Sequence, residues 1–166
     1  MSLVVRQVIA DDAQGITDVL NPIIVEGLYT VLDTTFSADE EKEFIEQFPE
    51  QGVFTVVVNT DESKIIGFQN VEPFASYTKA FDHVGIIGTF VSDESRGQGV
   101  SKMLFQSTFE VAKLKGYEKL FAYVRSDNER ALAAYLKQGF EIVGTAKRHA
   151  KVAGIYIDEI LIEKFL

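Results

Sequence analysis

The segment from Val91 to Ser101 combines residue types that favour binding of an anion. It reads as a strand end, a polar loop with two glycines, and the start of a helix. Glycines let the backbone curl until successive N–H groups converge on one point, and a helix N-terminus adds unsatisfied donors and a partial positive charge. We therefore predict a phosphate-binding loop, although a glycine pair alone is more typical of a plain strand-to-helix turn. The residues of the predicted loop are Arg96, Gly97, Gln98, Gly99, Val100 and Ser101.

Single residues exclude several other kinds of site. The dinucleotide-binding fingerprint requires a third glycine where this chain has Lys102, and the chain has no Gly-Lys-Ser/Thr of a P-loop. The turn at Ser101 begins like a nucleophile elbow but has Met103 where the second glycine should be. Cysteine is absent, and the two histidines, His83 and His149, are too few for a closed zinc site.

A second pattern lies downstream, on a helix expected to begin after Ser126. Its residues are Asn128, Ala131, Tyr135, Gly139 and Phe140. Taken alone, Asn128 indicates a helix cap and Tyr135 a core aromatic residue at helical spacing. In this order and at this distance, the glycine loop and this helix together resemble the GNAT family of N-acetyltransferases, whose loop reads Arg/Gln-x-x-Gly-x-Gly/Ala. Ser101 departs from that motif, but serine is small and keeps its backbone N–H.

The resemblance implies acetyl-CoA as co-substrate and a role for each matching residue. The pyrophosphate would bind to the loop from Arg96 to Ser101, and the pantetheine arm to the backbone of Phe90 and Val91 and to Asn128. Tyr135 would lie at the sulfur, as the acid that protonates the departing thiolate. The segments 21–36 and 148–158 resemble, less specifically, the small-amine or phosphinothricin-type branch, and a branch similar to ribosomal-protein N-acetyltransferases is the alternative.

The implied reaction moves an acetyl group from acetyl-CoA to the primary amine of a small molecule or peptide. Because cysteine is absent, we expect direct attack in a ternary complex rather than a cysteine intermediate. The candidate bases for the amine are Glu26, Glu72, His83 and Asp158, with a chain of water molecules as an equal alternative. Two rival functions stay open: a catalytically silent acyl-CoA-binding sensor, and a nucleotide-binding regulator, which the failed nucleotide motifs disfavour.

The elements that position these residues follow from hydrophobic periodicity and capping signals. Strands are expected at 4–9, 53–58, 64–71, 83–91, 120–124, 140–143 and 155–163, and helices after Asp11 or Asp12, from Ser37 to about Phe48, at 100–115 and after Asn128. Pro22 predicts a kink in the first helix or a restart capped by Asn21. The order β-α-α-β-β-β-α-β-α-β-β predicts a single α/β (α+β) domain over residues 1–166, with a mixed, mostly antiparallel central sheet and helices on both faces.

Composition and charge limit the possible partners. The chain has 166 residues, of which 46% are hydrophobic and 25% charged, as in an average globular domain. The net charge of −9 argues against a nucleic-acid partner. Residues 1–83 carry 4 Lys/Arg and 15 Asp/Glu, whereas residues 84–166 carry 12 and 10, so an anion is expected on the second half and a cation on the first. No apolar run of 18 residues and no signal-peptide pattern occur, so we expect no membrane partner and a cytoplasmic protein, with a homodimer left open.

Overall fold

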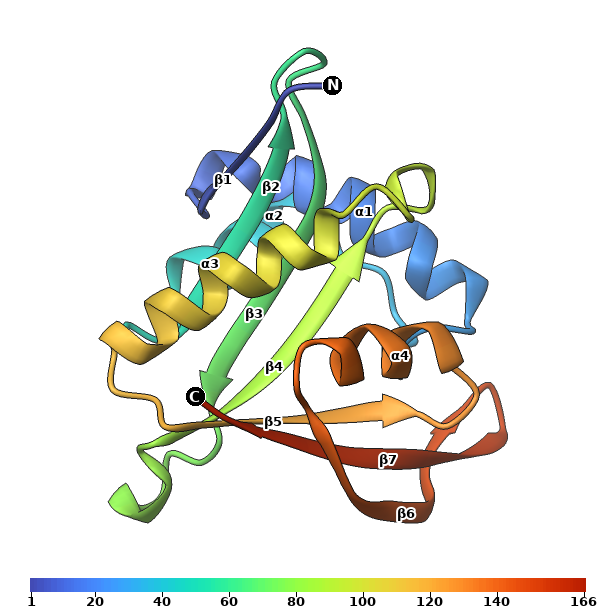
Figure 1. The fold of residues 1–166 in the computed structure, drawn as a ribbon. Coiled ribbons are helices and arrows are strands. Elements are labelled where there is room, and N and C mark those ends of the chain that lie inside the picture. Colours follow the sequence, from blue (N-terminus) through green and yellow to red (C-terminus); the bar gives the residue numbers. More distant parts are fainter.

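The computed structural model describes residues 1–166, which form a seven-stranded sheet in the order β1-β2-β3-β4-β5-β7-β6 (Figure 1). The strands are β1 (Leu3–Gln7), β2 (Val53–Asn59), β3 (Lys64–Pro73), β4 (Val84–Val91), β5 (Lys119–Arg125), β6 (Glu141–Val152) and β7 (Ile155–Phe165). The helices are α1 (Ala13–Glu26), α2 (Ala38–Glu46), α3 (Val100–Leu114) and α4 (Glu129–Lys137). The predicted order of elements and the mixed α/β fold class are confirmed. No helix has both the length and the apolar character needed to cross a bilayer.

Strands β4 and β5 stay together over only a short length. They form a parallel pair in which Val84–Ile86 lies opposite Lys119–Phe121. Beyond Ile86, β4 pairs with β3 alone, and its other edge from Ile87 to Val91 has no strand partner. Figure 1 shows the two strands diverging from this point, with α4 drawn between them in this view. This opening in the middle of the sheet is named the β4–β5 gap below.

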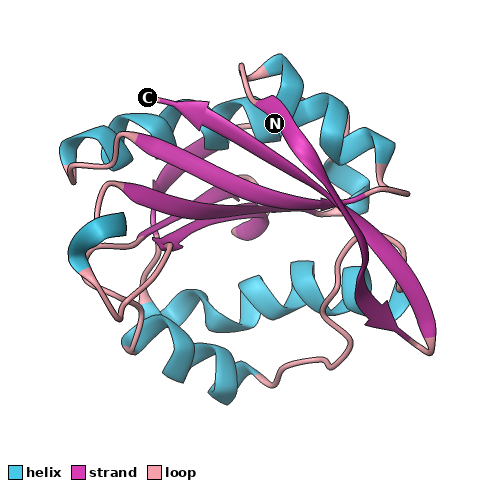
Figure 2. Ribbon diagram, turned by 90° about the horizontal axis from the view of Figure 1, so that it is seen from below, coloured by secondary structure: helices cyan, strands magenta, loops and turns pink.

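Helices cover both faces of the sheet (Figure 2). On one face, Ile16 of α1 packs in a cluster with Phe68 of β3. On the other face, Phe105 of α3 and Tyr135 of α4 pack in a cluster with Leu120 of β5. The division follows from the two-residue period of a strand, which sends successive side chains to opposite faces. The cluster under α3 and α4 contains residues from both sides of the gap, among them Ile87 of β4 and Leu120 of β5.

Two local predictions about helix starts have different outcomes. The capping box of α2 is confirmed, because Ser37 Oγ accepts from the Glu40 N–H at 3.1 Å and Glu40 Oε2 accepts from the Ser37 N–H at 3.3 Å. The predicted restart at Asn21 is wrong, since α1 continues through Pro22. The side chain of Asn21 instead binds the backbone N–H and carbonyl of Phe36. Burial of the apolar side of α1 on both sides of the proline offsets the hydrogen bond that Pro22 cannot make.

The strand expected to start within residues 140–143 is β6, which begins at Glu141, but the sequence reasoning did not predict how far it extends. Strand β6 runs on to Val152, and its register against β7 shifts between Ala146 and Ala150. The shift is a bulge around Arg148, which has a φ of 51°. A bulge breaks the two-residue alternation, which explains why periodicity did not reveal the second half of this strand.

Candidate active site

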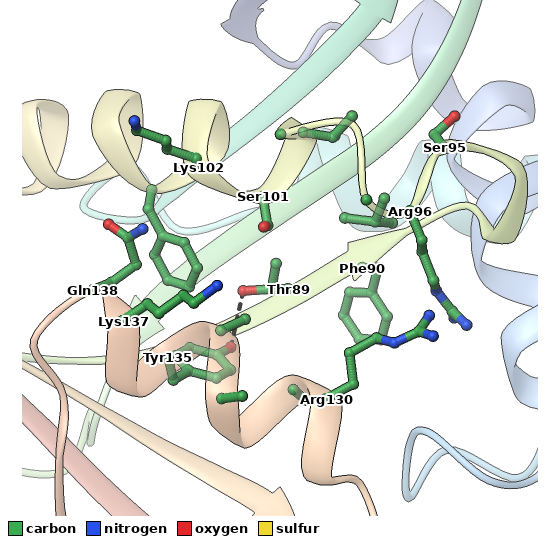
Figure 3. A pocket seen from close by; sticks show the side chains of 18 of the residues that line it. Thr89, Phe90, Ser95, Arg96, Ser101, Lys102, Arg130, Tyr135, Lys137 and Gln138 are labelled. Carbon is green, nitrogen blue, oxygen red and sulfur yellow. Dashed lines mark hydrogen bonds between the residues drawn. The ribbon is translucent and has the colours of Figure 1, made fainter.

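A cavity of about 670 Å³ lies between the N-terminus of α3, the side of α4 and the free edge of β4 (Figure 3). Phe90, Val91, Arg96, Gly97, Gly99, Val100, Ser101, Asn128 and Tyr135, all predicted from the sequence, line it. Lining residues that the sequence reasoning missed include Tyr29, Thr89, Ser95, Lys102, Phe105, Arg130, Lys137 and Gln138. Of the predicted residues, Gln98 is not in the lining, because its side chain turns back to donate to the Glu94 carbonyl at 3.2 Å.

The glycine loop presents backbone donors to this cavity. Gly97 and Gly99 have φ values of 77° and 80°, in the left-handed region where a side chain would be strained. The first N–H of α3 that donates within the helix belongs to Met103, which reaches the Gly99 carbonyl at 3.2 Å. The N–H groups of Val100, Ser101 and Lys102 therefore have no intrahelical acceptor, and together with the helix dipole they favour an anion at this point.

Four cations line the cavity, and no Asp or Glu does. Arg96 forms an ion pair with Asp93 and lies 4.5 Å from the centre of the Tyr29 ring, so its charge is already partly compensated. The other three, Lys102 of α3 and Arg130 and Lys137 of α4, have no carboxylate within 4.0 Å. In a chain of net charge −9, this cluster gives the cavity a positively charged lining, which favours an anionic ligand.

The free edge of β4 offers backbone groups to the gap. The Ser92 N–H donates to the Ile66 carbonyl of β3 at 2.9 Å. Because hydrogen-bonding groups alternate between the two edges of a strand, the backbone of Val91 faces the gap and that of Phe90 faces β3. Phe90 contributes its ring instead, which stacks on Phe68 with the centroids 4.9 Å apart. Of the two predicted residues, Val91 is thus the one whose backbone can pair with a ligand in the gap.

Tyr135 forms the inner, water-poor end of the cavity. Its side chain is 6% exposed and lies in edge-to-face contact with Phe105 and Phe140, at centroid distances of 5.2 and 5.1 Å. The phenol oxygen is 2.9 Å from Thr89 Oγ1 (Figure 3). Burial raises the pKa of the Tyr135 phenol to about 12, although the Thr89 hydrogen bond acts in the opposite direction. The phenol is therefore protonated at neutral pH.

Asn128 is a helix cap as well as a lining residue. Its Oδ1 accepts from the Ala131 N–H at 3.1 Å, and its Nδ2 donates to the Tyr29 carbonyl at 3.3 Å. Arg125 reinforces the same junction, because its guanidinium donates to the carbonyls of Gly27 and Thr30. These bonds tie the start of α4 to the segment that follows α1, which forms one side of the cavity.

None of the four candidate bases lines this cavity. Glu26 and Asp158 line a second cavity of about 580 Å³, at the end of α1 and the β6–β7 hairpin. The backbone N–H of Arg148 donates to Asp158 and lowers the pKa of that carboxyl, which makes it a weaker base. Burial raises the pKa of Glu72. The chain holds no cluster of three or more acidic, cysteine or histidine side chains suited to a metal ion.

Comparison with known families agrees with this geometry. The model of the acetyltransferase (GNAT) family matches residues 25–140, which include the glycine loop and Tyr135. The chain belongs to this family. It is 24% identical, over 93% of its length and 91% of the relative's, to a phosphinothricin N-acetyltransferase of Streptomyces coelicolor.

Solved structures of other GNAT proteins share the fold over nearly the whole chain. A ribosomal-protein-alanine N-acetyltransferase from Brucella melitensis superposes with a TM-score of 0.91 at 21% identity, covering 98% of this chain and 99% of that one. A GNAT superfamily phosphinothricin acetyltransferase from Sinorhizobium meliloti, solved in complex with acetyl-CoA, superposes with a TM-score of 0.90 at 20% identity, covering 100% and 89%.

Proposed function

We propose that this acetyltransferase uses acetyl-CoA to acetylate the primary amine of a small molecule or an exposed peptide N-terminus. The observation that carries the proposal is the cavity itself, whose lining combines the backbone donors of the glycine loop, four cations and a buried phenol. Acetyl-CoA combines phosphate groups with a thioester at opposite ends of a long molecule. The relatives named above support the co-substrate and the amine acceptor.

The residues present fit this co-substrate. The N–H groups of Val100 to Lys102 and the unpaired cations Lys102, Arg130 and Lys137 would hold the phosphates. The gap-facing backbone of Val91 would pair with the amide groups of the pantetheine arm, as an added strand does. A silent sensor would use the same residues for binding, so only turnover separates the two functions.

Bound acetyl-CoA would supply an activated acetyl thioester. The Val91 N–H, which faces the gap, would stabilise negative charge on the carbonyl oxygen as the nitrogen–carbon bond forms. Tyr135 gives its proton to the sulfur as the carbon–sulfur bond breaks, and it recovers a proton from water. The proton that the amine loses goes to water, because no carboxylate or imidazole lines the cavity.

The lack of a base in the cavity favours an acceptor that is easily deprotonated. At pH 7, removing the proton costs about 4.6 kcal/mol for a lysine-like amine of pKa about 10.4 and about 1–1.4 kcal/mol for an α-amine of pKa about 7.7–8.0. We therefore place α-amines first, and the acidic first half of the chain favours acceptors without net negative charge.

The test is CoA release from acetyl-CoA with a panel of amines, together with calorimetric titration of acetyl-CoA. We expect binding, and release that is fastest with uncharged or cationic α-amines such as amino acid amides. Binding without release for any amine would indicate the silent sensor. An acceptor of net negative charge as the best substrate would contradict the charge argument.

A further inference from the structure

Gln69 is a wholly buried amide that the mechanism above does not use. It lies on β3 with 0% of its surface exposed, beside Val71, which is equally buried. Its Nε2 donates to Thr89 Oγ1 at 2.8 Å, whereas its Oε1 has no hydrogen-bond partner. Burying an amide oxygen without a partner is costly, and an apolar side chain of similar size would avoid that cost. The one interaction that can explain a buried amide at this position is therefore the hydrogen bond from Gln69 to Thr89.

Thr89 connects Gln69 to the phenol of Tyr135. The two strand residues are opposite each other in the β3–β4 register, and they share the face that α3 and α4 cover. Thr89 Oγ1 lies 2.8 Å from Gln69 Nε2 and 2.9 Å from Tyr135 Oη. An amide nitrogen can only donate, so Thr89 Oγ1 accepts from Gln69 and keeps its own hydroxyl proton for a second bond.

The direction of that second bond decides where the phenol proton points. If Thr89 donates to Tyr135 Oη, the three groups form a head-to-tail chain, the arrangement in which hydrogen bonds strengthen one another. The phenol oxygen then accepts from Thr89, and its own proton is free to point into the cavity. If Tyr135 donated to Thr89, its proton would be held on the strand side and would be withdrawn from the cavity.

We infer that Gln69 and Thr89 are positioning residues, which orient the Tyr135 hydroxyl so that its proton faces the ligand. The inference rests on the proposed function, since it assigns Tyr135 the donor role toward the sulfur. As the carbon–sulfur bond breaks and the sulfur takes the phenol proton, the Thr89 hydroxyl donates to the phenolate oxygen until water returns a proton. The ring itself is held by Phe105 and Phe140, so its place does not depend on Thr89.

A double-mutant cycle on CoA release tests this relation. Thr89→Val removes the hydroxyl with little change of shape, and we expect kcat to fall about tenfold, with the Kd of acetyl-CoA within about threefold. Gln69→Leu should lower kcat about threefold. Thr89→Ser should restore kcat, because it restores the hydroxyl. In a Tyr135→Phe background, Thr89→Val should have no further effect on kcat.

The matched control is Thr108→Val. Thr108 of α3 is a wholly buried threonine that donates to Thr55 Oγ1 at 3.1 Å under the same helix, without a bond to Tyr135. The Thr108→Val variant should leave kcat unchanged. Equal losses for Thr89→Val with and without the Tyr135 hydroxyl would overturn the inference, and so would a loss for Thr108→Val as large as that for Thr89→Val.

A second readout needs no acceptor and therefore no turnover. Biosynthetic labelling with 3,5-difluorotyrosine gives six ¹⁹F signals for the six tyrosines, and the Tyr135→Phe variant assigns one of them. Because Thr89 donates to the ionised oxygen, Thr89→Val should raise the pKa of that residue, and Thr89→Ser should bring it back. An unchanged titration in Thr89→Val would overturn the inference even where no amine is acetylated. Wild-type protein that does not bind acetyl-CoA would instead contradict the proposed function.

Discussion

At the loop end of the cavity the groups that face a ligand are the backbone N–H donors at the start of α3 and the guanidinium of Arg96, whereas at the gap end they are one phenol and one strand edge. The loop end is open to solvent, and its donors can compensate the negative charge of a ligand. The gap end is nearly dry, with Tyr135 6% exposed between Phe105 and Phe140. Under the proposed function, groups at the loop end act equally on the bound co-substrate throughout the reaction, so we expect them to contribute affinity. A buried proton donor matters only while a bond breaks, so it contributes rate.

The largest effect should come from removing the hydroxyl at the gap end. In Tyr135→Phe we expect kcat to fall about 10²–10⁴-fold, the usual span for general acid catalysis, while the Kd of acetyl-CoA stays within about threefold. The measurement is CoA release and calorimetry on the same preparation. Tyr117→Phe is the matched control, because Tyr117 is also buried but donates to the Gln51 carbonyl outside the cavity. An unchanged kcat in Tyr135→Phe would mean that water protonates the sulfur.

A negative charge placed in the glycine loop should weaken the binding of acetyl-CoA and leave kcat nearly unchanged, the reverse of what we expect for Tyr135→Phe. Gly99→Asp strains a left-handed backbone and sets an anion beside the phosphates, and we expect the Kd of acetyl-CoA to rise about 10–100-fold. At saturating acetyl-CoA, kcat should stay within about threefold. Gly154→Asp, at a φ of 79° in the β6–β7 hairpin, carries the same strain and charge away from the cavity. If both variants weaken binding equally, the loop assignment is wrong.

Neutralising the cations of α4 should have a smaller effect. Arg130→Gln or Lys137→Gln should each raise the Kd about two- to fivefold and reduce the dependence of binding on salt, since exposed charges contribute little and are screened. Lys147→Gln, which removes an exposed lysine on β6 paired with Asp158, is the control. Binding that is insensitive to salt in the wild type would contradict an electrostatic role for this cluster.

The smallest effect is expected at Ser101. Ser101→Gly keeps the backbone N–H and should change the affinity for acetyl-CoA less than about threefold. Calorimetry under the conditions used for Gly99→Asp measures it. A large change in either direction would show that the hydroxyl itself holds a phosphate oxygen.

The two ends also differ in how far the sequence predicts them. The glycine loop and the start of α4 are each one continuous stretch of chain, and their geometry depends on residues that are close in sequence. Residue types and spacing were therefore enough to predict Gly97, Gly99 and Asn128. Arg130 and Lys137 were missed, although they are seven residues apart and therefore on one side of a helix. Gln69 and Thr89 could not be paired in this way, because their contact depends on the register of β3 against β4.

The order of the helices and strands could be predicted from the sequence, but some of their boundaries could not. Periodicity and caps located every helix and strand, but they did not show that α1 continues through Pro22 or that β6 extends beyond the bulge at Arg148. At Pro22 the burial of α1 outweighs the local signal, and at Arg148 the bulge breaks the alternation on which the prediction depends. The same limit applies to the candidate bases Glu26, Glu72, His83 and Asp158, because the tertiary fold, and not their own neighbours in the chain, decides that they lie outside the cavity.

The β4–β5 gap has a consequence for the lifetime of the protein. It divides the sheet into β1–β4 and β5–β7–β6, which only the short pairing of Val84–Ile86 with Lys119–Phe121 joins. On the unpartnered edge of β4, the amide hydrogens of Ile87, Thr89 and Val91 face the gap and should exchange early, because no neighbouring strand protects them. A ligand that occupies the gap at 100 times its Kd adds about 2.7 kcal/mol to the free energy of unfolding. Under the proposed function, resistance to proteolysis should therefore rise with the concentration of acetyl-CoA.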